Sequence, residues 1–224
     1  MKHVMIDIET LGRNAGCVVM SIAAVEFNPI VPLEELTENG HARICNKIDS
    51  FYRTIDVLPQ LFDGAEIEPA TLEWWRNQGQ GVKNSITSID SIGMKAALSD
   101  LSDFLEKNLD EKAELTVWAQ GTDFYIAILR HLFNKYFGSD SEPWCHTKIR
   151  DSRTFIFTMG DLLGTCRPYD LIPKLQYNVT HCALDDATRA AYNVAYLYAL
   201  YQKDMKKDLT CPANCKGNIV SHGE

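Results

Sequence analysis

"HVMIDIET", residues 3–10, is a short apolar run whose second half carries two acids, Asp7 and Glu9. In a β-strand, residues two apart point to the same face, so both carboxylates would lie on one side of a sheet. Two such acids repel each other and are costly to bury without a partner. The strand could instead end at Asp7 and leave both acids in solvent. The preceding apolar residues favour a buried central strand, whose acidic end lies where α/β proteins place their sites.

The rest of the chain supplies partners for this strand. Apolar runs at residues 17–27 and 50–56 predict two more strands, and residues 114–119 predict a fourth. Helix-start signals and helical spacing of apolar residues predict helices at residues 68–78, 94–109, 150–164 and 183–205, and a further one after the turn at Gly121. This order predicts an α/β fold, with a mixed sheet covered by helices. We expect one domain in residues 1–205 and a polar tail in residues 206–224.

A second acidic motif lies near the other end of the chain. "HCALDDATRAA", residues 181–191, places His181 ahead of a helix whose first turn carries Asp185 and Asp186. Acids in a first turn interact favourably with the helix dipole, so this motif has a purely structural interpretation when it is taken alone.

Composition limits how the chain could act. The net charge of -8 and pI near 5.3 exclude a grip along the backbone of duplex DNA, which requires a basic surface, so any nucleic-acid contact would be local and helped by cations. No apolar run approaches a membrane span, which predicts no membrane partner and a cytoplasmic protein, in the host cytoplasm if a phage encodes it. The seven Cys residues fit that compartment, and Cys211 and Cys215 lack the second pair of a zinc site.

Six segments in order resemble the DEDDh superfamily of 3′–5′ exonucleases, which has a ribonuclease-H-like fold and includes ribonuclease T. They are "DIET", "SIAAVEF", "TLEWWRNQ", "VWAQGTDF" followed by "IL", "RDSRT" and "HCALDDA", and they span roughly residues 3 to 200. Within the superfamily the chain looks most like the phage and prophage group that contains the phage T4 DexA exonuclease and a mycobacterial exoribonuclease. The resemblance implies a ribonuclease-H-like mixed β-sheet flanked by α-helices, and a homodimer as in several relatives.

The resemblance also implies the site. Asp7, Glu9 and Asp186 would be ligands of two metal ions, and His181 would be the general base that activates the attacking water. Thr10 and Leu11 would contact the 3′-terminal nucleotide of a single strand. Two cations stabilise the entering and leaving oxygens of a phosphodiester, and carboxylate ligands favour Mg²⁺ or Mn²⁺ over zinc.

One family motif is altered in this chain. In "VWAQGTDFYIAIL", residues 117–129, Tyr125 stands where the family has a metal-binding Asp, and Asp123 stands two residues earlier. Asp123 could be a displaced ligand, it could be only the N-cap of the next helix, or Tyr125 could mark an inactive form. A phenol cannot replace the charge of a carboxylate at neutral pH. We predict that Asp123 contributes as a metal ligand, with an inactive nucleic-acid-binding relative as the alternative.

Two other motifs carry open alternatives. Trp74 and Trp75 could stack on a base, but neighbouring helix residues diverge, so at least one is expected in the core. Arg150 and Arg153 could hold a phosphate or fix a nearby loop, and the second role is favoured.

Overall fold

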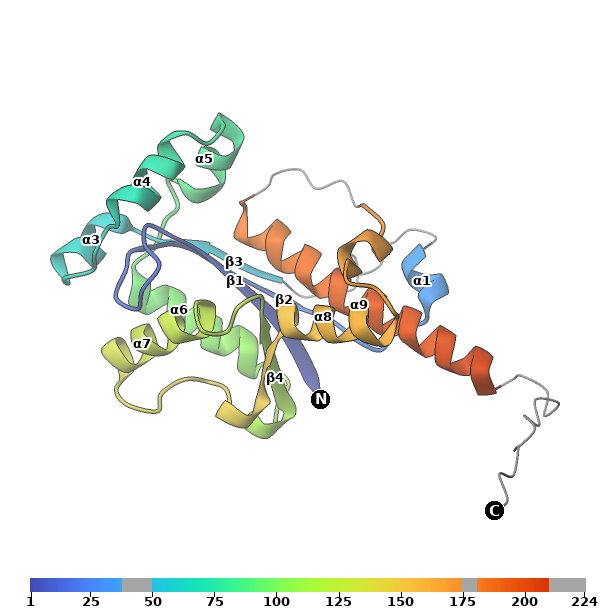
Figure 1. The fold of residues 1–224 in the computed structure, drawn as a ribbon. Coiled ribbons are helices and arrows are strands. Elements are labelled where there is room, and N and C mark those ends of the chain that lie inside the picture. Colours follow the sequence, from blue (N-terminus) through green and yellow to red (C-terminus); the bar gives the residue numbers. More distant parts are fainter. Residues whose placement is uncertain (38–49, 175–180, 210–224) are drawn as a thin grey trace, which may run out of the picture.

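The computed structural model describes residues 1–37, 50–174 and 181–209. Its centre is a five-stranded sheet in the order β3-β2-β1-β4-β5 (Figure 1). The strands are β1 (Lys2–Thr10), β2 (Val19–Glu26), β3 (Ser50–Thr54), β4 (Leu115–Ala119) and β5 (Ile149–Asp151). β1 pairs antiparallel with β2 and parallel with β4, so the sheet is mixed and β1 is central, as the sequence predicts. The short β5 was not predicted, because three residues are too few to show a period.

The two faces of β1 carry different side chains. Val4, Ile6 and Ile8 belong to a core cluster with residues of α6 (Met94–Glu106) and α7 (Tyr125–Phe137). Met5 lies on the opposite face and packs with alanines of α9 (Ala183–Leu209). The period-two alternation of a strand therefore turns Asp7 and Glu9 toward the α9 side of the sheet.

Helices cover both faces, which confirms the predicted α/β, ribonuclease-H-like class. α6 and α7 lie on one side of the sheet and α8 (Ser152–Leu162) and α9 on the other (Figure 1). Three helices, α3 (Val57–Phe62), α4 (Pro69–Arg76) and α5 (Gln80–Ile86), form one end of the molecule. The short helix α1 (Leu33–Thr37) follows β2 in the chain. α8 begins two residues later than predicted, because residues 150 and 151 complete β5. α9 continues to Leu209, past the predicted domain boundary, and Cys211 and Cys215 lie outside the described residues.

A buried glutamine fixes the irregular end of β2. The register between β1 and β2 shifts after Glu9, where Thr10 pairs with Val19. The side-chain amide of Gln60, only 2% exposed, donates to the Val19 carbonyl at 2.8 Å and accepts from the Val19 N–H at 2.9 Å. The Gln60 side chain thus takes the place of a neighbouring strand for the N–H and C=O of Val19. Val19 pairs with Thr10, the residue that follows Glu9.

We expect Gln60→Ala to destabilise the fold by about 2–3 kcal/mol, because it leaves the N–H and C=O of Val19 buried without partners. For a chain of this size that corresponds to a fall in melting temperature of roughly 5–10 °C, measurable by circular dichroism. Gln80→Ala, at an exposed position of the same region, serves as the control and should change the melting temperature little. Equal melting temperatures for both variants would contradict the role assigned to Gln60.

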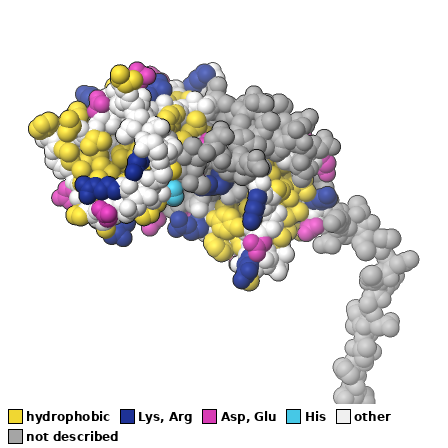
Figure 2. All heavy atoms as spheres, turned by 90° about the horizontal axis from the view of Figure 1, so that it is seen from above, with side chains coloured by type: hydrophobic (Ala, Val, Ile, Leu, Met, Phe, Trp, Pro, Cys, Tyr) yellow, Lys and Arg dark blue, Asp and Glu magenta, His cyan; other side chains and the backbone are white. Residues whose placement is uncertain are grey.

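The end of the molecule formed by α3, α4 and α5 exposes many apolar side chains. Seen from above, hydrophobic side chains gather there, with Lys and Arg at their margin (Figure 2). Exposed large apolar residues of this region are Leu58, Leu61, Phe62, Trp74 and Ile89. None of the helices described has the length and apolar character needed to cross a membrane.

Candidate active site

Three of the predicted metal ligands converge on one point. β1 contributes Asp7 and Glu9, and the first turn of α9 contributes Asp186. One carboxylate oxygen from each lies within 4.8 Å of those of the other two. The pairing of β1 with β4 ends at Met5, so the acidic half of β1 extends past the end of β4, beside the turn that leads into α7.

Burial and mutual repulsion make this cluster electrostatically unfavourable on its own. Asp7 is 7% exposed, and burial, followed by the charges of Glu9 and Asp186, raises its pKa well above the usual range. Burial and the charge of Asp186 raise the pKa of Glu9 to about 8. Burial also raises the pKa of Asp186, although the Arg189 guanidinium, which donates to its Oδ1 at 2.6 Å, acts in the opposite direction. Converging carboxylates with raised pKa values fit a divalent cation such as Mg²⁺ or Mn²⁺, whose charge would remove the repulsion.

His181 lies beside the same cluster. Its backbone has φ of +61°, a left-handed conformation that is uncommon for a residue other than glycine. Its N–H contacts the Asp186 carboxyl, whose pKa both this contact and the His181 charge act to lower. Its imidazole packs edge-on against the Trp74 indole, with 4.7 Å between ring centroids. The structure therefore brings His181, Asp186 and Trp74 together, although α4 and α9 are far apart in sequence.

A cavity of about 400 Å³ opens next to Glu9. Its lining includes Glu9, Thr10, Trp74, Phe124 and Tyr125. Trp74 is 42% exposed, whereas Trp75 is 5% exposed and donates its indole N–H to the Thr10 carbonyl at 2.8 Å. The expectation that at least one of the two tryptophans lies in the core is thus confirmed for Trp75.

The two predicted nucleotide contacts differ in their placement. Thr10 lines the cavity, and its hydroxyl donates to the Gly12 carbonyl at 2.5 Å. Leu11 is buried in the cluster that contains Val18 and Trp75, and its backbone N–H donates to the Val18 carbonyl. Only Thr10 therefore offers side-chain surface to the cavity, and a contact from Leu11 stays a prediction.

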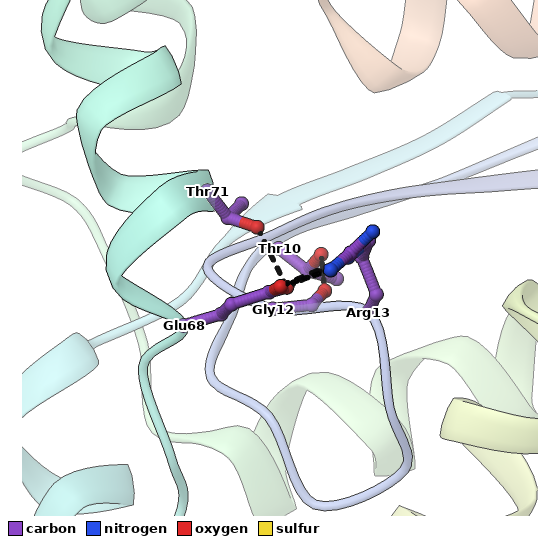
Figure 3. A network of polar contacts seen from close by, with 5 residues as sticks. All are labelled: Thr10, Gly12, Arg13, Glu68 and Thr71. Carbon is purple, nitrogen blue, oxygen red and sulfur yellow. Dashed lines mark hydrogen bonds and ion pairs between the residues drawn. The ribbon is translucent and has the colours of Figure 1, made fainter.

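An ion pair borders the cavity (Figure 3). The Arg13 guanidinium, whose side chain is 75% exposed, donates to both carboxylate oxygens of Glu68, and the Thr71 hydroxyl donates to Glu68 Oε2 at 3.0 Å. This network ties the segment after β1 to the start of α4. It was not predicted, because Arg13 and Glu68 are 55 positions apart in the sequence and no local pattern relates them.

The altered motif places Tyr125, and not Asp123, against the carboxylates. Tyr125 is the first residue of α7, and its phenol is in hydrogen-bonding contact with the Asp7 carboxyl. Burial, together with the charge of Asp7, raises the pKa of this phenol well above its usual range. Asp123 is exposed and does not belong to the cluster of Asp7, Glu9 and Asp186. The N-cap residue of α7 is Phe124, with no side-chain capping hydrogen bond, so the structure does not place Asp123 at the N-cap.

Asp151 holds the turn that positions Tyr125. Its Oδ2 accepts from the Thr122 N–H at 3.0 Å, and its Oδ1 caps α8 by accepting from the Thr154 N–H at 2.7 Å. Arg153 donates to the Gln120 carbonyl of the same turn at 3.1 Å. Gly121, with φ of +118°, supplies the backbone conformation that the turn needs. The loop-fixing role favoured for the two Arg residues of "RDSRT" therefore fits Arg153, whereas Arg150 donates to the carbonyls of Thr147 and Ile149 instead.

Taken together, the mixed sheet and the acidic cluster at the end of its central strand define a ribonuclease-H-like α/β protein with a candidate metal site. The family model described as the 3′-5′ exoribonuclease Rv2179c-like domain matches residues 2–198, and the chain belongs to this family. The broader DEDD exonuclease superfamily is thus confirmed, while the DEDDh subgroup and the grouping with phage exonucleases stay predictions. No curated protein sequence matches the chain.

Solved structures share the fold at low sequence identity. Cell-death related nuclease 4 superposes with a TM-score of 0.52 and 15% identity, over 92% of this chain and 64% of the nuclease. Escherichia coli exonuclease I, in complex with a dT13 oligonucleotide, superposes with a TM-score of 0.55 and 14% identity, over 93% of this chain and 42% of that enzyme. The chain thus spans less than two thirds of the length of either protein.

Proposed function

We propose that the chain is a metal-dependent 3′–5′ exonuclease that removes nucleotides from the 3′ end of a single strand. The observation that carries this proposal is the convergence of Asp7, Glu9 and Asp186 within 4.8 Å beside an aromatic-lined cavity. Membership in a family of 3′–5′ exoribonuclease domains supports the direction of hydrolysis. The cytoplasmic location and the homodimer predicted from the sequence stay part of this proposal.

Each residue of the site has a chemical task in this reaction. Asp7, Glu9 and Asp186 would hold the cation, which when bound polarises the scissile phosphate and stabilises the charge on its oxygens. His181 would accept a proton from the attacking water, whose oxygen forms the new bond to phosphorus. The bond between phosphorus and the 3′ oxygen of the preceding nucleotide breaks, and that oxygen takes up a proton from solvent. The terminal nucleotide leaves as a 5′-monophosphate.

The cavity and the charge of the chain together favour a single-stranded end. The net charge of -8 gives little attraction for a duplex backbone. Trp74 and Phe124 present aromatic surface beside Glu9, and base stacking on such surfaces does not require a defined sequence. In this proposal the terminal base enters the cavity and its phosphate faces the carboxylates.

We expect Trp74→Ala to weaken binding of a single-stranded oligonucleotide by about tenfold, because stacking of one base contributes roughly 1–3 kcal/mol. The measurement is fluorescence anisotropy of a 5′-labelled single strand, with Ca²⁺ in place of Mg²⁺. Trp144→Ala would disturb the core, so Phe157→Ala, at an exposed site on α8, is the better control. An unchanged affinity in Trp74→Ala would remove this residue from the substrate site.

The proposal itself is tested with a 5′-labelled single strand, as DNA and as RNA, incubated with Mg²⁺ or Mn²⁺. A ladder that shortens from the 3′ end is expected, with 5′-mononucleotides as the product. The altered motif at Tyr125 favours one alternative, a relative that binds nucleic acid but has lost activity. That alternative predicts oligonucleotide binding with no shortening under either ion.

A further inference from the structure

Tyr125 lies against Asp7, at the position where the resemblance to the exonuclease superfamily implies a metal-binding Asp. Its phenol contacts the Asp7 carboxyl from the first turn of α7, and Phe124 and Tyr125 are held by N–H bonds to the Gly121 carbonyl, each 3.1 Å long. The ring is fixed on its other side by edge-on packing with Phe124, 4.9 Å between centroids. The backbone bond to Gly121 and the ring contact with Phe124 therefore hold Tyr125 in place while its phenol contacts Asp7.

The carboxylates supply ligands for one ion. Asp7, Glu9 and Asp186 form the group, and within the described part of the chain no other His, Cys, Asp or Glu joins it. Asp123 is exposed, and its Oδ1 lies beside Gly121, 3.6 Å from the position that a Cβ atom would take on that glycine. A second ion would thus have to share all its carboxylates with the first and take a neutral phenol as its own ligand.

The charge of the site also matches one divalent cation. The three carboxylates carry three negative charges when ionised, and Arg189 returns one positive charge through its 2.6 Å contact with Asp186. The net negative charge that remains is balanced by one Mg²⁺ or Mn²⁺. Two other nearby groups also affect the pKa of Asp186: His181 lowers it and Asp185 raises it. Two divalent ions would leave an excess of positive charge in a largely buried site.

We propose, building on the function proposed above, that the chain binds one divalent cation firmly through Asp7, Glu9 and Asp186, and that Tyr125 takes the place of the ligand for a second cation. Tyr125 is a positioning residue here, because its hydroxyl orients the Asp7 carboxylate toward the single ion. The two-ion site expected from the resemblance is thereby reduced to one firm site. A second ion, if the reaction uses one, would arrive with the phosphate of the substrate.

The test is a count of bound Mn²⁺ in the metal-free full chain, by calorimetric titration and by the electron paramagnetic resonance signal of free Mn²⁺. We expect one firmly bound ion in the natural sequence and in Tyr125→Phe, and two in Tyr125→Asp, which adds a carboxylate at that position. Asp123→Asn should keep one ion, and Asp7→Asn should lose it. Circular dichroism establishes that each variant is folded.

Two ions of similar affinity in the natural chain would overturn the proposal, as would a single ion in folded Tyr125→Asp or loss of the ion in Asp123→Asn. Nuclease assays of the same samples separate this proposal from the proposed function. Shortening of the oligonucleotide with two bound ions would refute the one-ion site alone, whereas one bound ion without shortening would refute the nuclease activity alone. If both hold, Tyr125→Asp should shorten the strand about tenfold faster or more, because both reacting oxygens then face a firmly held cation.

Discussion

Asp7→Asn lowers the rate of 3′-nucleotide release by on the order of 10³-fold or more, and we expect this to be the largest effect of any single substitution in the chain. Asp7 is the most buried of the three converging acids, and its carboxyl contacts the Tyr125 phenol. Asn keeps the shape of the side chain but cannot supply a negative oxygen. The rate is measured with a 5′-labelled single strand at saturating Mn²⁺.

The controls for this variant address folding. Asp161→Asn, an exposed acid on α8, should keep the full rate. Without metal, Asp7→Asn should be more stable than the natural chain near neutral pH, because a buried, repelled charge is removed. A variant that is folded, more stable and inactive identifies a metal ligand, whereas a folded variant with full activity would rule out this site for the reaction.

Local sequence patterns predicted four strands of the five-stranded sheet and the shared face of two of the site's acids. The alternation in residues 3–10 predicts both the strand and the shared face of Asp7 and Glu9, because side-chain direction in a strand depends only on position. The helix from Ala183 follows from its spacing of alanines, which pack on β1 and β2. The meeting of Asp186 with β1 did not follow from any such pattern. It was predicted from resemblance alone.

Contacts between distant segments were beyond the reach of the sequence. The contact of Tyr125 with Asp7, the hold of Asp151 on Thr122 and the bonds of Gln60 to Val19 each depend on three-dimensional packing. Asp151 is an example: both of its carboxylate oxygens accept backbone N–H groups, and no local sequence pattern predicts the bond from Thr122, 29 positions away. A single substitution at position 125 changes what the neighbouring carboxylates can bind, and only the fold reveals which carboxylate it touches.

The metal-free chain loses stability as the pH rises from about 4.5 to about 8. Glu9 has a pKa of about 8 in the fold against 4.5 in the unfolded chain, so in this interval the folded state binds more protons. Stability falls with pH wherever the folded state binds more protons, and the fall ends above the folded pKa. Asp7 and Asp186, whose pKa values are also raised, act in the same direction. Asp151 has a lowered pKa, because the Thr154 and Thr122 N–H groups bond to its carboxylate despite its burial. Its effect on stability is therefore confined to lower pH. The expected loss is about 3–5 kcal/mol, or roughly 10 °C in melting temperature.

Scanning calorimetry of the metal-free chain at pH 5 and pH 8 measures this loss, and Mn²⁺ should reverse it at pH 8, because binding to ionised carboxylates stabilises only the folded state. Glu9→Gln should flatten the dependence on pH, since its amide carries no proton that titrates, while Glu106→Gln on the exposed face of α6 should leave it unchanged. If the metal-free chain were equally stable at both pH values, the cluster would not be the repulsive, cation-seeking site inferred from its geometry. A loss that Glu9→Gln removes and Mn²⁺ reverses would tie the charge of these carboxylates to the ion they hold, by a measurement that requires no substrate.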